Sequence, residues 1–412
     1  MNSPIVQSLH IYPIKSTSGI ALSHSWVDDF GLSFDRRFVV TDLEGQFITA
    51  RTQPKLCLIQ CHLTTDGLVL TAPNMPQLDI VFANFSEQYH QVTVWKDQIN
   101  ALYCHQIYDK WFSQYLNLPC QLHFFAEKSS RQVKNKDNQV GFADGYPLLL
   151  ISQASLGDLN NRIAQRNGDS DNTGVSMTQF RPNIVVNDTQ AFDEDSWHRI
   201  KIGEVEFEVT KPCSRCVFTT VNPENGQKHP EQEPLSSLKT YRQVAKGDVM
   251  FGQNLIPLNK GQVKQGDKVT IISKQSPPTF ISKVSSNDIT ASSSKEMANS
   301  ATLSNSTITK SPEKTPAKSA EAIPNKVTIQ FKSWSKKHKG NTQEPILDQG
   351  ETAGLILPYS CRGGMCGRCK IKLDSGVVKQ LADDGLTDDE KAEGYVLACS
   401  SIPQSDLVLS SS

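Results

Sequence analysis

Two cysteines three positions apart, Cys213 and Cys216, have a spacing that points to chemistry. They lie between an alternating apolar stretch at 205–209 and a second apolar stretch at 217–221, and we expect both stretches to be strands. A cysteine at such a junction points its sulfur into the space that the sheet surrounds, and the neighbouring Arg215 favours a thiolate. The pair alone leaves three interpretations open: half of a zinc site, a redox pair, or two buried apolar thiols.

A second group of cysteines lies near the C-terminus. Cys361, Cys366 and Cys369 have the spacing C-x4-C-x2-C, and Cys399 is a distant fourth. This is the plant-type spacing for a [2Fe–2S] cluster. Zinc ribbons use two close cysteine pairs instead, and this segment has one. The spacing therefore predicts an iron–sulfur cluster.

The runs at 359–364 and 397–399 are similar to those of plant-type ferredoxins. The resemblance covers 326–412 and implies a β-grasp fold with a strand at 327–331 and a helix at 346–354. Thr387 and Glu390 have the capping-box spacing that predicts a second short helix. A cluster with four cysteine ligands has no open iron position, so it passes single electrons and performs no substrate chemistry. We therefore expect a second redox centre in the larger part of the chain.

Acidic residues crowd one part of this C-terminal domain: Asp383, Asp384, Asp388, Asp389, Glu390 and Glu393. A solvated face is the simpler interpretation. The functional alternative is a landing surface for a basic flavin reductase, because complementary charge raises the rate of association.

Composition excludes several function classes. The chain has 412 residues and a formal net charge of −1, which gives no electrostatic reason to expect a nucleic-acid polymer or a membrane surface as partner. No apolar run approaches the ~18 residues of a membrane span. The first residues lack the basic and apolar regions of an export signal, so the ten cysteines indicate thiols and metal ligands rather than disulfides. We expect a cytoplasmic protein.

Short alternating runs separated by turns predict a mainly β protein. In residues 1–125, the turn Asp66-Gly67 joins runs at 56–63 and 68–71, and an apolar stripe at 107–116 predicts one helix. Residues 126–274 form a second β-rich unit, with a helix capped by Ser152. Many short strands favour barrels over a parallel sheet. Residues 275–325 predict a disordered tether of roughly 50 residues and about 40 Å that lets the domain at 326–412 dock and undock.

Five runs in residues 4–272 resemble the MOSC family, whose β-barrel domains bind molybdenum cofactor. They are Ile11-Tyr12-Pro13-Ile14-Lys15-Ser16, Asp35-Arg36-Arg37-Phe38, Thr49-Ala50-Arg51, Arg181-Pro182-Asn183-Ile184-Val185-Val186 and Cys213-Ser214-Arg215-Cys216. The order of an N-terminal MOSC barrel, a MOSC domain and a ferredoxin is that of bacterial fusions of the YcbX type. The first part is also close to the mitochondrial amidoxime-reducing component.

The resemblance implies a molybdenum-cofactor site between these runs. The anionic pterin needs cations for its phosphate and a soft thiolate for its metal. Three residues are expected to supply the charge: Lys15, Arg36 and Arg181. Five others are expected to hold the phosphate and the pterin edges: Ser16, Asp144, Asn183, Ser214 and Arg215. By resemblance the molybdenum ligand is Cys216, with Cys213 as the alternative.

The resemblance also implies a molybdenum-dependent reductase of N-hydroxylated compounds such as 6-N-hydroxylaminopurine and similar base analogues. Electrons would pass from NAD(P)H through a separate flavoprotein to the [2Fe–2S] cluster. One departure concerns the substrate: Gly145-Tyr146-Pro147 stands where relatives carry small hydroxyl residues. Two other hypotheses stay open, a sulfur carrier or cofactor-maturation protein with a persulfide on Cys216, and a ferredoxin-type electron donor to another enzyme.

Overall fold

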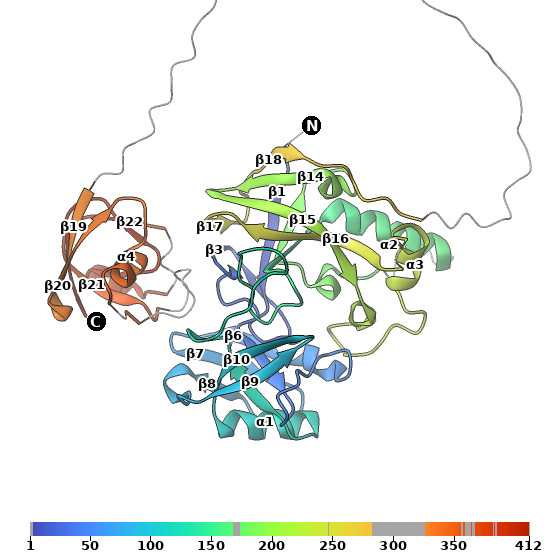
Figure 1. Cartoon of the computed structure of the whole chain (residues 1–412), viewed down its shortest axis with the longest axis horizontal. Coiled ribbons are helices and arrows are strands. Elements are labelled where there is room, and N and C mark those ends of the chain that lie inside the picture. Colours follow the sequence, from blue (N-terminus) through green and yellow to red (C-terminus); the bar gives the residue numbers. More distant parts are fainter. Residues whose placement is uncertain are drawn as a thin grey trace, which may run out of the picture.

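The largest sheet combines strands from both ends of the first 274 residues (Figure 1). The computed structural model describes residues 3–167, 174–245, 247–281, 326–355, 357–358, 364, 367–381, 383 and 385–411. In this part of the chain the sheet has eight strands, in the order β18 (Val269–Lys274), β14 (Trp197–Ile202), β15 (Val205–Arg215), β16 (Val249–Pro257), β12 (Leu148–Ser152), β13 (Ile184–Asn187), β1 (Ile5–Ile11) and β2 (Ile20–Leu22). Only β12 and β13 pair in parallel. The first strand of the chain thus belongs to the sheet of the second domain.

The first domain adds three smaller sheets, counted over the described residues. One contains β5 (Phe38–Thr41), β11 (Gln121–Phe124), β10 (Asp97–Tyr103) and β9 (Tyr89–Val94). The second contains β6 (Gln60–Leu63), β7 (Gly67–Thr71) and β8 (Leu78–Val81). The third joins β3 (His24–Asp28) and β4 (Gly31–Leu32) to β17 (Gly261–Lys264) of the second domain. The prediction of a mainly β protein is confirmed.

The predicted helices are present. The apolar stripe forms α1 (Gln106–Leu116), which buries Trp111, Phe112 and Tyr115. Ser152 precedes α2 (Gln153–Asn167), and its hydroxyl accepts a hydrogen bond from the Ser155 N–H at 3.0 Å, as an N-cap does. The second domain also contains α3 (Leu235–Tyr241). Among the helices of the described residues, none is long and apolar enough to cross a membrane.

One predicted strand is wrong, and another is a strand only in its second half, β6. The stretch 217–221 forms the 3-10 helix η5 (Val217–Thr220), because the Cys216 carbonyl accepts hydrogen bonds from the backbone and hydroxyl of Thr219. The first half of the run at 56–63 forms the 3-10 helix η1 (Pro54–Leu58), because Pro54 suits the first helical turn. Three further 3-10 helices occur in the described part of these domains: η2 (Phe82–Asn84), η3 (Met177–Phe180) and η4 (Asp193–Ser196).

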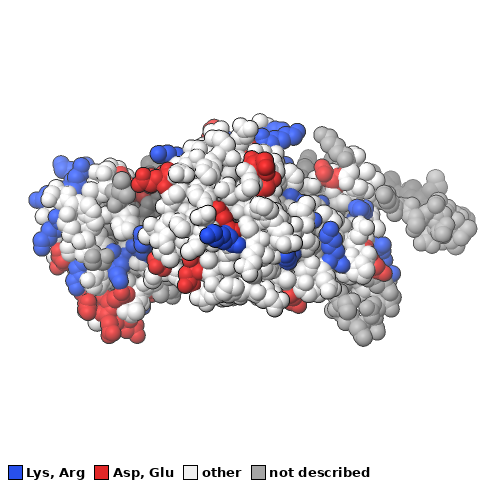
Figure 2. Space-filling view, turned by 90° about the horizontal axis from the view of Figure 1, so that it is seen from below, with Lys and Arg blue, Asp and Glu red and all other residues white. Residues whose placement is uncertain are grey.

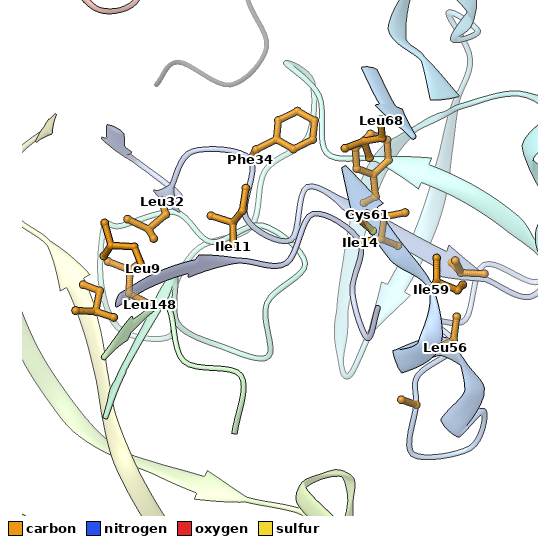
Figure 3. Packing of buried hydrophobic residues seen from close by; sticks show 14 of the residues in the cluster. Leu9, Ile11, Ile14, Leu32, Phe34, Leu56, Ile59, Cys61, Leu68 and Leu148 are labelled. Carbon is orange, nitrogen blue, oxygen red and sulfur yellow. The ribbon is translucent and has the colours of Figure 1, made fainter. Parts of the chain in front are cut away.

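One hydrophobic core joins the first two domains. Figure 3 shows that Leu9 of β1 packs beside Leu32 and Leu148, whereas Ile14 lies farther along, near Ile59 and Cys61. Fully burying a Leu or Ile side chain contributes about 1.5–3 kcal/mol. The segment that follows β1 is therefore held firmly between the two domains.

The C-terminal domain has a separate core and the β-grasp arrangement implied by its resemblance to ferredoxins. Its described strands are β20 (Lys336–Asn341), β19 (Lys326–Phe331), β25 (Leu407–Ser411), β21 (Lys370–Ser375) and β23 (Tyr395–Leu397) in one sheet, with β22 (Val378–Gln380) and β24 (Ser401–Pro403) as a separate pair. Its helices are α4 (Ile346–Thr352), α5 (Asp388–Ala392) and the 3-10 helix η6 (Lys332–Trp334). The predicted capping box of Thr387 and Glu390 begins α5.

Part of the predicted tether, 282–325, lies outside the described residues. Residues 275–281 are described, and they run along the second domain. The N–H of Gln275 donates to the Ser196 carbonyl, and the N–H of Ile281 donates to the Gln243 carbonyl.

Candidate functional site

One cavity brings together the residues that the sequence suggested for the cofactor. Because β1 runs antiparallel to β13 and β13 runs parallel to β12, the end of β1 and the starts of β12 and β13 lie at one edge of the sheet. Two bulges bend β15, whose last residues line the same cavity. The predicted residues in the lining are Lys15, Ser16, Arg36, Asp144, Arg181, Asn183, Cys213, Ser214, Arg215 and Cys216.

Strained backbone marks this cavity. Ser16, Arg36 and Arg181 line it with φ angles of 76°, 46° and 55°, in the left-handed region that residues with a Cβ rarely adopt. Each such residue costs on the order of 1–3 kcal/mol, and strain of this kind clusters at ligand sites. The surrounding core is therefore holding these side chains in positions that an unconstrained chain would avoid.

A buried tyrosine organises the cationic end of the cavity. The ring of Tyr12 has guanidinium carbons of Arg36 and Arg181 at 4.3 and 4.1 Å from its centroid. Arg36 donates to Asp35 at 2.6 Å and to the amide oxygen of Asn183 at 3.0 Å. That oxygen also accepts the Leu149 N–H, so Asn183 fixes the position of Arg36.

Two arginines that line this cavity each have a buried guanidinium nitrogen without a hydrogen-bond partner among the described residues: Arg181 Nη2 and Arg215 Nε. Burial, with the like charge of Arg36 as a second cause, lowers the pKa of Arg181 to about 10. Unsatisfied buried donors are costly, and an anion accepting from them would remove that cost. The residues present therefore fit a phosphorylated, hydrogen-bonding cofactor.

The other end of the cavity contains an ion-pair network around Asp144. This carboxylate accepts from Lys15 Nζ at 2.6 Å and from Arg51 Nη2 at 3.1 Å. The positive charges of Lys15 and Arg51 hold the pKa of Asp144 well below its usual range, although this side chain is partly open to solvent. Burial lowers the pKa of Lys15 to about 8, although Asp144 offsets part of that effect.

The position of Asp144 is set by a close approach between the backbone just before it and the backbone of Arg36. The Phe142 N–H donates to the Arg36 carbonyl at 2.9 Å, and a Cβ at Gly141 would come within 2.9 Å of that same oxygen. The buried guanidinium of Arg131 also donates to the carbonyls of Gly141, Ala143 and Asp144. The glycine and this arginine together fix the segment that carries the carboxylate.

The two cysteines have different surroundings. Arg51 Nε lies 3.3 Å from the sulfur of Cys216 and also belongs to the Asp144 network. Cys213 packs against the hydrophobic cluster beneath α2 and α3, and Arg215 Nη1 donates to its sulfur at 3.1 Å. A guanidinium beside a sulfur can hydrogen-bond to that sulfur when the cysteine binds a metal.

Sequence reasoning missed three residues here: Tyr12, Arg51 and Trp95. The first two belong to runs that carried the family resemblance, so position within a motif was an available signal. Trp95 lies outside every motif, yet its indole N–H donates to Asp144 at 3.3 Å. The signal that the sequence offered for Trp95 was an aromatic residue at a position where a turn is expected.

The proposed cluster site is described in part. The buried sulfurs of Cys369 and Cys399 lie 3.1 Å apart, and the Cys399 N–H donates to the Cys369 sulfur at 3.5 Å. Two converging thiols and a backbone donor fit the cysteine ligation of an iron–sulfur cluster. Cys361 and Cys366 lie outside the described residues.

Comparison with known proteins decides the family. Residues 3–119 match the MOSC N-terminal beta barrel domain, residues 137–270 the MOSC domain, and residues 336–404 the 2Fe-2S iron-sulfur cluster binding domain. The mitochondrial amidoxime-reducing component 1 of Mus musculus is 35% identical over 287 residues, which are 65% of this chain and 82% of the relative. The chain belongs to the MOSC family of the amidoxime-reducing components.

Other relatives of this MOSC protein have similar coverage. The Homo sapiens component 1 is 33% identical over 65% of this chain and 82% of its own length, and the Danio rerio protein is 32% identical over 64% and 84%. A solved ferredoxin reductase in carbazole 1,9a-dioxygenase matches 22% of this chain and 29% of its own at 27% identity, with a TM-score of 0.21. The domain matches support molybdenum cofactor and a [2Fe–2S] cluster as the cofactors of this MOSC protein.

Proposed function

We propose that this chain reduces N-hydroxylated compounds at a molybdenum cofactor held in the cavity between its first two domains. The observation that carries the proposal is the pair of buried, unpartnered guanidinium nitrogens of Arg181 and Arg215 in the cavity that contains Cys216. Its relatives are amidoxime-reducing components, and the same chain has a cluster domain able to deliver electrons.

Side chains at the two ends of the cavity would bind different parts of the cofactor. Arg36, Arg181 and Arg215 would hold the cofactor phosphate and pterin edges, because their donors converge at the end where Tyr12 lies. Cys216 would be the metal ligand, with Arg51 stabilising its thiolate. When bound, the molybdenum centre would supply the redox chemistry that breaks the N–O bond.

Protein groups must then supply the protons that the reduction consumes. Reduction of R–NHOH to R–NH2 and water consumes two electrons and two protons. Lys15 is suited to deliver a proton from its Nζ atom, because its pKa is about 8 and Asp144 stabilises its charged form. The arrangement would keep a proton donor at the cavity near neutral pH.

An electron route is proposed through a groove shared by the cluster domain and the first domain. Arg368, next to the cluster ligand Cys369, lines this groove together with Phe34 and Arg37. Gln262 of the second domain also donates to the Leu381 carbonyl of the cluster domain at 3.3 Å. Since Arg37 lines the groove and its neighbour Arg36 lines the cavity, a short segment would separate the docked cluster domain from the cofactor.

The electrons would come from an NAD(P)H-dependent flavoprotein reductase. The exposed acidic residues on and after α5, Asp388, Asp389 and Glu393, offer a surface for a basic partner. Figure 2 shows acidic side chains gathered at the end of the molecule that Figure 1 assigns to the C-terminal domain. A reductase with a complementary basic face is the expected partner.

The test combines metal analysis with one substitution. Protein made in cells that assemble the pterin should contain molybdenum and iron and should reduce 6-N-hydroxylaminopurine. Cys216→Ala should lower that activity by more than about 100-fold, since even outer-shell changes cost 10–100-fold. The visible spectrum of the iron–sulfur cluster should not change.

Cys213→Ala is the matched control, because it removes a sulfur from the same motif and should leave molybdenum bound. Wild-type protein that contains iron but no molybdenum would refute the proposal. Retained activity in Cys216→Ala would refute the ligand assignment alone.

A further inference from the structure

Trp95 has a backbone conformation that is unusual for its residue type. Pairing of Val94 with Asp97 leaves Trp95 and Lys96 as a two-residue loop between β9 and β10. The φ angle of Trp95 is 60°. The first position of such a loop with positive φ is normally Gly, Asn or Asp, because a bulky side chain is strained there. Strained non-glycine residues concentrate at functional sites.

Contacts to the cavity hold this indole in place. Arg51 lies over the ring with its guanidinium carbon 4.3 Å from the centroid, and the indole N–H donates to Asp144 at 3.3 Å. The Phe47 ring packs at 5.3 Å between centroids. Arg51 and Asp144 both line the cavity that contains Cys216, so Trp95 lies at the rim of that cavity.

The same indole is open to solvent. Trp95 is 48% exposed, although large aromatic side chains are usually well buried. A single exposed tryptophan needs no explanation by itself. Trp95 thus combines a strained backbone, an exposed side chain, one hydrogen bond and one cation–π contact to cavity residues. Tyr146 also lines the cavity and lies two positions after Asp144 in the sequence.

We propose that Trp95, at the rim of the cavity that Tyr146 also lines, forms an aromatic subsite that stacks on the planar ring of aromatic and heteroaromatic N-hydroxylated substrates. Every base has a π-face, so stacking would favour flat ring systems over aliphatic compounds. It would not distinguish one base from another. This inference rests on the proposed function and adds the substrate class to it.

Trp95→Gly is the informative variant, because glycine suits the positive φ and the hairpin should fold at least as well. In the full-length holoprotein, the ratio of kcat/KM for 6-N-hydroxylaminopurine to kcat/KM for acetamidoxime should fall roughly 10-fold, the size expected for loss of one base–aromatic stack. The change should be in KM for the purine. Trp95→Phe, which keeps a ring, should restore part of the ratio.

Asn74→Gly is the matched control. Asn74 is also exposed with a φ of 60°, but it lies in the turn that follows β7, away from the cavity residues. This variant should leave the ratio unchanged. A ratio within twofold of wild type in Trp95→Gly would overturn the subsite while leaving the proposed reductase intact.

Binding measured without turnover tests the aromatic subsite separately from the proposed reductase activity. Calorimetry with 6-N-hydroxylaminopurine should show about 10-fold weaker affinity in Trp95→Gly than in wild type. Equal affinity, or no binding to wild type, would overturn the inference even for a preparation without reductase activity.

Discussion

At the scale of single residues, charge is distributed unevenly along the cavity. Three guanidinium groups, of Arg36, Arg181 and Arg215, face the end beside Tyr12, and the carboxylate of Asp35 pairs with one of them. At the other end, Asp144 balances Lys15 and Arg51. An anion would be drawn to the first end, which leaves the second, near Cys216, for chemistry.

The Lys15 amine makes activity depend on pH. Its pKa of about 8 lies below the ordinary 10.5, so the charged form is lost as pH rises through the lower value. We expect kcat/KM for N-hydroxy reduction to decline with a midpoint at about pH 8 or above, measured as a pH profile. Lys15→Arg cannot lose its proton in this range, so its profile should lack that decline. The same midpoint in both proteins would exclude Lys15 as the titrating group.

At the scale of secondary-structure elements, a buried ion pair joins η4 to the strand that supports the cavity. Arg242, at the end of α3, donates two hydrogen bonds to Asp195 of η4 at 2.6 and 3.0 Å. Gln253 of β16 donates to the same carboxylate at 2.6 Å. Because β16 pairs with β15, this network supports the strand that brings Ser214 and Arg215 to the cavity.

Arg242→Met should destabilise the second domain by about 3–5 kcal/mol, because it leaves the buried Asp195 carboxylate without its partner. Urea unfolding followed by fluorescence would measure the loss. Arg242→Met combined with Asp195→Leu should recover much of it, since both charges are then absent. A single variant within about 1 kcal/mol of wild type would contradict this account.

At the scale of the whole molecule, the cluster domain faces a groove on the first domain that carries both charge and aromatic rings. Arg368 lines it with Glu87, Glu127, Arg37 and Lys128 from the larger part of the chain, together with Phe34, Phe82 and other rings. Glu87 and Glu127 attract Arg368 and so favour the docked arrangement, while Arg37 and Lys128 offset part of that attraction.

Arg368→Glu places like charges together and should weaken docking by about 1 kcal/mol, which corresponds to roughly fivefold slower electron transfer from the cluster. Stopped-flow absorbance of the cluster, reduced first and then mixed with substrate, would measure that rate. Lys337→Glu is the control, because Lys337 lies on β20 and is not part of the groove. Equal rates in both variants would exclude this groove as the docking site.

Features with a local cause could be predicted from neighbouring residues alone. The cysteine spacing predicted the cluster, Thr387 and Glu390 predicted the start of α5, and the stripe at 107–116 predicted α1. A capping box acts within four residues and a stripe within one helix, so neighbouring residues contain the information.

Contacts between distant residues could not be predicted in this way, because they depend on how the whole chain folds. Arg51, Trp95, Asp144 and Cys216 form one network, although they come from separate parts of the chain. The stretch after Cys216 became a 3-10 helix despite its strand-like residues, because a local carbonyl contact replaced the sheet ladder. Pairing of β1 with β13 created the edge where the cavity lies, and no short window of sequence contains that pairing.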